Sequence, residues 1–493
     1  MEKERSNGNR EYKERLIALT SERLENLASQ MKFRLYEGQG EAFFLLGVSD
    51  EGQFKGLSPD EMKKSLVNLS AIAEEINAKV RILRIRDGID GHVAEVLICQ
   101  EKDSDELPID VRIASVGNVD TGKSTVLGVL MTGEPDDGNG LARNVVFRHL
   151  HEFESGRTSS VSIKSIGFTI EGEIINQNPI KRPTDSELLE LSHKTLTFLD
   201  LAGHERYLKT TIFGLTGLQP DYALLVVAAN QGILPMTREH LGLALALRIP
   251  LFVVITKIDL APEPKKKQTL HDLLNLLKLP GIALVPFVIK DEDDAIIAAR
   301  TLLARKVAPI FQVSAVTMKG FDIFQSFLSL LRPTQEEEFD PQEDFHAFID
   351  DVFSVPGVGT VVAGTILSGE IHKNDSVFLG PTDTGQYLPT KVRSMHYKRV
   401  FTNHSIAGHS VTFALQGIHR DEVRKGMILV KEINGRLAVR RFAANVFILY
   451  HSTTIRPGYS PVIHCKSIQQ AARVVRMSKD IVRTGDRCSM EFE

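Results

Sequence analysis

The feature that most constrains the fold of this chain is a run of nine residues, Gly117-Asn118-Val119-Asp120-Thr121-Gly122-Lys123-Ser124-Thr125. It follows an apolar stretch, Val111–Val116, and precedes a second one, Val126–Leu130, which has helical spacing. The spacing GxxxxGK[ST] between a strand and a helix is typical of a P-loop. Its glycines let backbone N–H groups turn toward phosphates, and the helix N-terminus adds a favourable dipole. We therefore predict a nucleotide site in which Lys123 reaches the β- and γ-phosphates and Ser124 binds Mg²⁺.

The region from Asp110 to about Leu331 alternates apolar strands with helical stretches. Such alternation predicts βαβ units and a mainly parallel sheet. The expected strands are Val111–Val116, Leu196–Leu199, Ala223–Val227, Leu251–Ile255 and Ile310–Val313.

A second group of candidate residues, Asp200-Leu201-Ala202-Gly203-His204, ends the strand Leu196–Leu199. A carboxylate at the carboxyl end of a strand can hold Mg²⁺ through water, which assigns this role to Asp200. Gly203 can then offer its N–H group to a γ-phosphate. Taken alone, the pentapeptide is also compatible with an ordinary turn, but its position in order after the P-loop favours the nucleotide site.

Two further sequence motifs predict that the base of the nucleotide is guanine. Thr256-Lys257-Ile258-Asp259 follows the strand Leu251–Ile255, and Asp259 can accept hydrogen bonds from guanine N1–H and N2–H₂, which adenine cannot supply. A site built for those bonds discriminates strongly against a base that lacks them. Lys257 can lie along the base, and Ser314-Ala315-Val316 can give a backbone N–H to guanine O6.

Regions of different character flank this α/β segment, which we place at residues 108–332. Residues 1–107 predict an α+β domain: Lys32–Gly47 is typical of a hairpin interrupted by glycine, and Ser58-Pro59-Asp60-Glu61 predicts a capped helix start. Arg332–Asp344 has the composition of a linker. Beyond it, short strands broken by Gly and Pro predict two β-barrels, at 333–435 and 436–493.

Bulk composition narrows the class of protein. The three cysteines, Cys99, Cys465 and Cys488, are scattered, so neither a disulfide framework nor a CxxC zinc pattern is expected. The charged N-terminus is unlike a signal peptide, and the apolar runs are shorter than the ~20 residues of a membrane helix. We expect a cytoplasmic protein that does not span a membrane.

Charge is distributed unevenly along the chain. The net charge is −4, whereas residues 386–493 hold 18 Lys/Arg and 7 Asp/Glu, a balance of +11 that leaves −15 for the rest. This uneven distribution of charge is compatible with a C-terminal half that faces a polyanion. It is equally compatible with an ordinary solvent-exposed surface of a β-domain.

Together these motifs resemble the five G-motifs of translational GTPases, the elongation-factor-Tu superfamily. The segments 349–364 and 416–426 resemble that family's second-domain barrel, and 441–493 fits its third-domain barrel more loosely. Glu152–Ser160 resembles switch I of the GTP-binding protein one/two subgroup. Thr256 in place of Asn and Ala202 in place of Pro are also similar to that subgroup.

The resemblance implies roles for individual residues. Thr158 matches the switch I threonine that completes the Mg²⁺ shell with GTP, and His204 matches the histidine that orients the attacking water. Asp120 matches an aspartate that helps to place a monovalent cation near the phosphates, so Asp120, Lys123 and His204 form the expected catalytic set. Arg157 stands where an elongation factor has an apolar residue that, opposite Val119, gates the catalytic histidine. The arginine is either a loop residue that faces solvent or an internal arginine finger. Thr256 predicts a weaker brace of the P-loop than Asn.

The resemblance also implies partners: GTP or GDP with Mg²⁺, aminoacyl-tRNA and the ribosome, for a protein that is monomeric when free. An alternative is a GTP-switched adaptor that recruits an RNA-decay or quality-control partner through residues 1–107. A third reading, as an initiation factor, is disfavoured because three dispersed cysteines cannot make the zinc knuckle usual in that factor. Lys257 and Asp259 argue against an ATPase.

Overall fold

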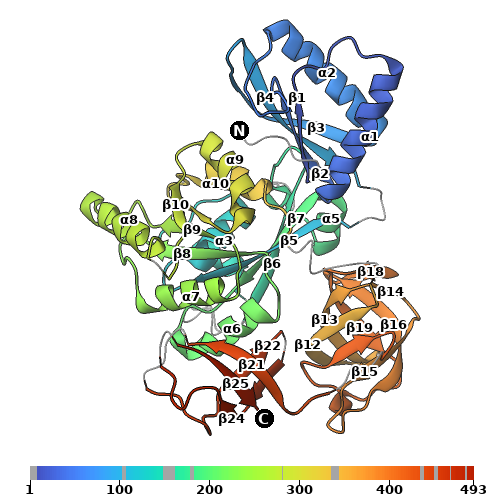
Figure 1. Ribbon diagram of the computed structural model, residues 1–493, viewed down its shortest axis with the longest axis vertical. Helices are drawn as coiled ribbons and strands as arrows, with labels where there is room; N and C mark the ends of the chain where they lie inside the picture. Colours follow the sequence, from blue (N-terminus) through green and yellow to red (C-terminus); the bar gives the residue numbers. More distant parts are fainter. Residues whose placement is uncertain are drawn as a thin grey trace.

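The computed structural model describes residues 8–102, 107–147, 161–177, 182–279, 281–334, 343–433, 438–448, 453–466, 468–483 and 486–493. An α+β unit lies at one end of the molecule, an α/β unit in the middle and two β-units at the other end (Figure 1). This arrangement confirms the predicted multidomain class.

The N-terminal unit is a four-stranded sheet, ordered β1-β2-β4-β3, with two helices. A capping box between Ser58 and Glu61, with Pro59 at the first helical position, starts its second helix as predicted. The predicted hairpin at Lys32–Gly47 is wrong, because residues 32–37 continue the first helix and the segment contains a single strand, Glu41–Leu46. The elements are β1 (Arg10–Lys13), α1 (Ser21–Glu37), β2 (Glu41–Leu46), α2 (Pro59–Glu75), β3 (Ala78–Asp87) and β4 (His92–Gln100).

The two faces of this sheet are buried by different partners. Helices α1 and α2 cover one face, where Met31, Phe44 and Ile72 share a core. The opposite face contributes Phe43, Leu97 and Cys99 to the core of the α/β unit. Burial of this apolar surface holds the two units together.

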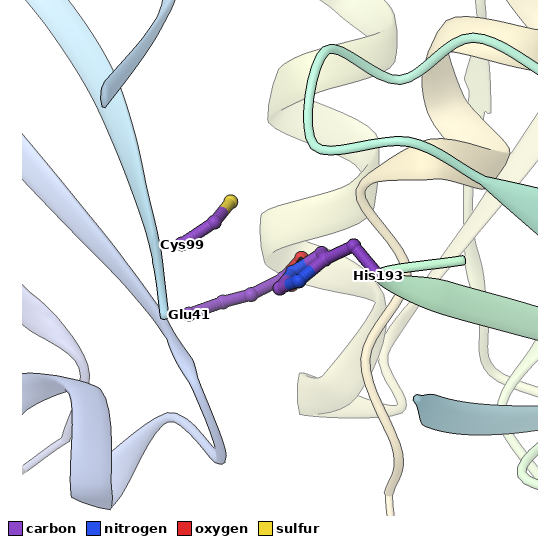
Figure 2. A group of neighbouring side chains, drawn as sticks. All are labelled: Glu41, Cys99 and His193. Atoms are coloured by element: carbon purple, nitrogen blue, oxygen red, sulfur yellow. Dashed lines mark hydrogen bonds and ion pairs between the residues drawn. The ribbon is translucent and has the colours of Figure 1, made fainter. Parts of the chain in front are cut away.

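Buried ion pairs strengthen the same junction. The Glu41 carboxylate lies 3.3 Å from His193 Nε2, across the two units (Figure 2). It also lies 2.8 Å from Lys194 Nζ. Burial alone would raise the pKa of Glu41, but Lys194 and His193 outweigh it and lower that pKa to about 2. Glu95 in β4 likewise pairs with Arg84 and with Arg300 of the α/β unit.

We expect Glu41→Gln to destabilise the protein by about 3–5 kcal/mol, because it leaves the buried ammonium of Lys194 without its carboxylate. The matched control is Glu101→Gln, which breaks an exposed ion pair with Lys79 and should cost less than about 1 kcal/mol. Urea unfolding of both variants measures the difference. Equal midpoints would show that the Glu41 pair does not hold the junction.

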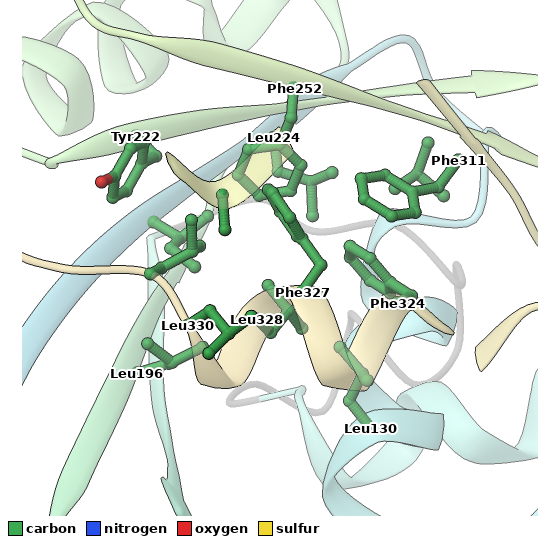
Figure 3. Packing of buried hydrophobic residues seen from close by; sticks show 14 of the residues in the cluster. Leu130, Leu196, Tyr222, Leu224, Phe252, Phe311, Phe324, Phe327, Leu328 and Leu330 are labelled. Carbon is green, nitrogen blue, oxygen red and sulfur yellow. The ribbon is translucent and has the colours of Figure 1, made fainter. Parts of the chain in front are cut away.

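The α/β unit has a seven-stranded sheet, ordered β10-β11-β9-β8-β5-β7-β6. Its pairings are parallel except that of β6 with β7, as the alternation of strands and helices predicted. On one face, Phe252, Phe311, Phe324 and Phe327 pack as a tight aromatic group (Figure 3). Its strands are β5 (Ile109–Gly117), β6 (Ser162–Phe168), β7 (Lys194–Asp200), β8 (Tyr222–Ala228), β9 (Leu251–Thr256), β10 (Val285–Val288) and β11 (Val307–Gln312).

The helices of this unit lie on both faces of the sheet (Figure 1). The longer ones are α3 (Lys123–Thr132), α5 (Asp185–Leu191), α6 (Leu208–Thr216), α7 (Pro235–Ala246), α8 (Glu263–Leu277), α9 (Glu292–Thr301) and α10 (Phe321–Ser329). Short 3₁₀ turns are η1 (Leu141–Val145), η2 (Ile175–Gln177), η3 (Glu205–Tyr207) and η4 (Leu302–Ala304). In the described residues, no helix is both long enough and apolar enough to cross a membrane.

The first C-terminal β-unit is a closed barrel. Six strands pair in the order β15-β20-β12-β13-β19-β16, and pairing of β15 with β16 closes the ring. The elements are β12 (His346–Val355), β13 (Gly359–Ser368), β14 (Glu370–His372), β15 (Ser376–Gly380), β16 (Leu388–Tyr397), β17 (Val400–Thr402), β18 (His404–Ile406), β19 (Ser410–Leu415), η5 (Arg420–Glu422) and β20 (Ile428–Val430).

The second C-terminal β-unit is smaller. Its described strands form a three-stranded sheet, β21-β25-β24, and a two-stranded sheet, β22-β23, around a shared core that includes Val474, Val482 and Met490. The strands are β21 (Phe442–Phe447), β22 (Val462–Cys465), β23 (Ile468–Ala471), β24 (Val474–Met477) and β25 (Arg487–Phe492).

Both β-units contact the α/β unit. The barrel is fixed near the start of β5, where Lys398 Nζ lies 2.7 Å from the Asp110 carboxylate, and Leu189 of α5 enters the barrel core. The smaller unit packs its strand β22 against helix α6. Because α6 follows directly after His204 and η3, this contact lies next to the predicted site.

Candidate nucleotide-binding site

The P-loop connects β5 to α3, as the sequence predicts. Gly117 has φ of 144°, and a Cβ atom there would lie 2.4 Å from the carbonyl oxygen of Val226. Only glycine can therefore occupy this position without moving β8. Gly122, in a left-handed conformation, caps the N-terminus of α3, so the loop ends at a helix start that favours an anion.

Lys123 is the buried cation of this loop. Its Nζ donates hydrogen bonds to the carbonyl oxygens of Asn118 at 2.7 Å and Gly117 at 3.2 Å. Burial lowers the pKa of Lys123 to about 8, although Asp200 and Asp120 act in the opposite direction. The lysine is thus held inside the loop and would gain electrostatically from a phosphate.

This pKa predicts that nucleotide binding takes up a proton in alkaline solution. Without nucleotide, Lys123 loses its proton as the pH rises through about 8, whereas phosphate oxygens favour the charged form and raise the pKa. The affinity for GDP should therefore fall as the pH rises above about 8, with net proton uptake on binding. Calorimetry at pH 8.5 in buffers of different ionisation enthalpy measures that uptake, and Lys123→Met should remove it. Uptake that persists in Lys123→Met would assign the proton to another group.

Hard oxygen donors suited to Mg²⁺ lie beside the P-loop. Ser124 Oγ donates to Asp200 Oδ2 at 2.6 Å, which places the hydroxyl and the carboxylate side by side at the ends of β7 and the loop. Mg²⁺ prefers oxygen ligands of this kind together with water and substrate phosphates. The two residues therefore fit the predicted ion, while Thr158 and Arg157 lie outside the described residues.

Gly203 and His204 lie at the next loop. A Cβ atom on Gly203 would be 2.5 Å from Lys123 Nζ and 2.7 Å from the carbonyl oxygen of Asn118, so this backbone lies directly against the P-loop. The His204 side chain caps η3, with Nδ1 accepting the N–H of Arg206 at 3.1 Å. Its imidazole is only partly buried and must turn from this capping position if it is to orient a water at the γ-phosphate.

The fourth motif braces the P-loop from the end of β9. Thr256 Oγ1 donates to the carbonyl oxygen of Thr121 at 2.6 Å, and Lys257 Nζ donates to that of Asp120 at 2.7 Å. Threonine therefore does brace the loop through a short, buried bond, and whether this brace is weaker than that of an asparagine stays a prediction. Asp259, two residues further on, is exposed.

The fifth motif has a support that sequence reasoning missed. The carbonyl oxygen of Ala315 accepts the N–H of Asp136 at 2.8 Å. The Asp136 carboxylate accepts three backbone N–H groups, from Gly138, Gly140 and Ala142. The run Asp136-Asp137-Gly138-Asn139-Gly140 is a turn signal that could have drawn attention to this loop. Ser314 and Val316 complete the motif, where Ser314 Oγ accepts the N–H of Thr317 at 3.1 Å.

His240 in α7 is a second residue that the sequence analysis did not identify. It is fully buried beneath the P-loop, and its Nδ1 accepts the N–H of Gly117 at 3.0 Å. Burial and the nearby charge of Lys123 lower its pKa to about 4, so the imidazole is neutral at physiological pH. It positions the first residue of the loop.

Two other groups of potential metal ligands occur in the described residues. In the first, Glu41, Cys99 and His193 converge at the junction of two units (Figure 2), but Lys194 already neutralises the carboxylate. We therefore interpret that group as part of the ion pairing between the two units rather than as a metal site. The second, Glu370, His372 and His404, is exposed on strands β14 and β18.

Comparisons with known proteins agree with this geometry. Residues 110–353 match the elongation factor Tu GTP binding domain, and residues 359–430 match elongation factor Tu domain 2. GTP-binding protein 1 of Xenopus laevis is 42% identical over 97% of this chain and 73% of its own length. GTP-binding protein 2 of Homo sapiens is 42% identical over 99% of this chain and 82% of its own length.

Among solved structures, the bacterial selenocysteine-specific elongation factor is similar, with a TM-score of 0.54 and 21% identity, over 78% of this chain and 53% of that one. This likeness concerns the fold. The fold and the site together define a GTPase of the elongation factor Tu type, a class that binds and hydrolyses GTP. The chain belongs to the group of GTP-binding proteins 1 and 2 within the translational GTPases.

Proposed function

We propose that this protein is a translation factor that binds aminoacyl-tRNA in its GTP form and hydrolyses GTP on the ribosome, during elongation or surveillance. The observation that carries the proposal is the contact of β22 with α6, which joins a cationic β-unit to the segment directly after Gly203 and His204. A change at the γ-phosphate can be transmitted to the RNA-binding surface through this contact. The proposed domains are 1–107, 108–332, 333–435 and 436–493, and the proposed location is the cytoplasm.

We assign each residue of the site a distinct role in GTP binding and hydrolysis. Lys123 and the P-loop N–H groups from Asn118 to Thr125 bind the phosphates, and Gly203 senses the γ-phosphate through its backbone. Ser124, Asp200 and Thr158 would hold Mg²⁺, which neutralises charge on the phosphate oxygens. Asp120 would hold a monovalent cation beside them. His204 orients the attacking water in line with the bond to be broken.

The base is held by the fourth and fifth motifs. Asp259 accepts the N1–H and N2–H₂ groups of guanine, Lys257 covers one face of the ring, and Ser314-Ala315-Val316 donates a backbone N–H to O6. Lys257 is already fixed to the P-loop carbonyl of Asp120, so base and phosphate recognition share one support.

A cationic surface on the smaller β-unit is the proposed RNA contact. Four of its arginines are exposed and take part in no ion pair within the described residues: Arg456, Arg473, Arg476 and Arg483. Free guanidinium groups bind phosphates well because of their planar, multiple donors. The aminoacyl end of a tRNA would lie across this unit and the barrel.

The test is binding of charged and uncharged tRNA to the protein with GTP and with GDP, at one stated salt concentration. We expect tight binding of charged tRNA with GTP alone. Arg476→Glu should weaken it and reduce the salt dependence by at least about one phosphate contact, while Arg23→Glu in α1 should not. Equal binding in all four states would remove the carrier function and favour the GTP-switched adaptor.

The adaptor is a second candidate because of the N-terminal unit. That unit shares a core and two buried ion clusters with the α/β unit, so it moves with the GTPase rather than on a flexible tether. A partner bound to it would be held at a fixed place relative to the nucleotide. In this reading, GTP hydrolysis times the release of an RNA-decay or quality-control partner.

A further inference from the structure

Two histidines and a glutamate share one face of the two-stranded sheet that β14 and β18 form. The strands are antiparallel, and His372 stands directly opposite His404. Successive side chains of a strand point to opposite faces. Ile371 is fully buried in the barrel core, so its neighbours Glu370 and His372 point away from that core. Both of them and His404 are exposed to solvent.

The distances among these three side chains suit a shared metal ion. Glu370 Oε2 lies 3.2 Å from His404 Nε2, and the rings of His372 and His404 have centroids 4.6 Å apart. One ligand atom from each of the three side chains lies within 4.8 Å of the other two. Zinc holds nitrogen and oxygen ligands at about 2.0–2.2 Å, which places them about 3.3–3.6 Å from one another in a tetrahedron. Small rotations of the exposed side chains close that difference.

The backbone that carries these side chains is held by hydrogen bonds of its own. In β14, the N–H of His372 donates to the Asp375 carboxylate at 2.9 Å. In β18, the carbonyl oxygen of His404 accepts the hydroxyl of Thr402 at 2.6 Å. Ligands on a scaffold that is already fixed need little reordering when a metal binds.

The charges around the three side chains favour a bound cation. Glu370 supplies one negative charge, and the ammonium of the adjacent Lys373 lies over the Phe401 ring, 5.1 Å from its centroid. Two histidines directly opposite each other are not a stabilising pair when both are protonated, because like charges across two strands repel. Neutral imidazole is the commonest metal ligand in proteins. A dication can therefore bind both histidines at once.

We propose that Glu370, His372 and His404 bind one zinc ion, with water at its fourth position. Imidazole and carboxylate are ligands that Zn²⁺ accepts, and a site with three protein ligands leaves one position open. The ion links β14 to β18, and the loop after β18 contacts the α/β unit, where the carbonyl oxygen of Gly408 accepts a hydrogen bond from Arg112. Zinc thus stabilises the barrel beside its junction with the GTPase. The site requires neither nucleotide nor RNA.

The test is titration of Zn²⁺ into the full-length protein with bound GDP and excess Mg²⁺ at pH 7.5, in competition with a chromophoric zinc chelator. Excess Mg²⁺ keeps zinc from the nucleotide site. We expect His372→Ala, His404→Ala and Glu370→Gln each to bind one zinc ion per chain at least about tenfold more weakly than the wild type. The matched control is His271→Ala, which removes an exposed histidine of α8 and should bind zinc as the wild type does.

Hydrogen exchange measures where the ion binds. Zinc should slow the exchange of backbone amides in β14 and β18 of the wild type, because an ion that binds the folded sheet opposes its local opening. His404→Ala should show no such protection. Nucleotide binding by each variant reports that the GTPase is folded. The proposal is overturned if the three variants bind zinc as tightly as His271→Ala does, or if zinc leaves the exchange of β14 and β18 unchanged in the wild type.

Discussion

Replacing Asp259 by Asn should lower the affinity for GTP and GDP by about 10²- to 10⁴-fold. In the proposed site the carboxylate accepts two hydrogen bonds from guanine, and bonds to a charged group contribute about 1.5–3 kcal/mol each. Asparagine keeps the size of the side chain but turns one acceptor into a donor that faces the N–H groups of the base. Titration with a fluorescent GDP analogue measures the loss.

The same substitution should change base preference in a specific direction. Xanthine carries a carbonyl oxygen where guanine carries its 2-amino group, so the new Asn donor finds an acceptor there. We expect the Asp259→Asn protein to bind xanthosine diphosphate more tightly than GDP, without gaining affinity for ADP. Asp272→Asn, an exposed residue of α8, is the control that alters the net charge equally. Unchanged GDP affinity in Asp259→Asn would remove Asp259 from base recognition.

The convergence of the motifs could be predicted from the sequence because each of them follows a strand of one sheet. Carboxyl ends of parallel strands meet at one edge, so motifs after β5, β7, β9 and β11 are brought together by topology alone. The short bonds from Ser124 to Asp200 and from Thr256 to the P-loop show the result. Local turn chemistry also identified the start of α2 from its capping box.

Features that depend on contacts between residues far apart in the sequence could not be predicted from local patterns. Phe43 and Leu97 have the alternation expected of any half-buried strand, and nothing in that pattern tells which unit covers the second face. Lys194 sits at the start of a strand, where exposure is the ordinary expectation, yet it is 1% exposed because Glu41 meets it from another unit. His240 in a helical stretch gave no sign that its ring would lie below Gly117. The Lys32–Gly47 error has a local cause: Gly38, Gly40 and Gly47 suggest turns, whereas the helical spacing of Leu27, Met31 and Leu35 continues into this segment.

Replacing His204 by Ala should reduce ribosome-stimulated GTP hydrolysis by about 10²- to 10⁴-fold, the range typical of a group that assists proton transfer or positions water. Nucleotide affinity should stay near the wild-type value, because in the proposed site the phosphates are held by Lys123 and the P-loop backbone. A single-turnover assay with purified ribosomes separates the chemical step from nucleotide exchange. Hydrolysis without ribosomes should change much less, since the imidazole then remains at Arg206.

The capping bond of His204 makes a second substitution necessary. Alanine removes both the imidazole and the acceptor that caps η3, and loss of a cap costs about 1 kcal/mol, which alone could disorder the loop. His204→Asn keeps a good capping acceptor but has no imidazole to reach the attacking water. If His204 acts on water, both variants lose the ribosome-stimulated rate together. If Asn restores the rate while Ala does not, His204 acts only by holding η3 and α6 in place, and the contact of α6 with β22 becomes the element that the ribosome must sense.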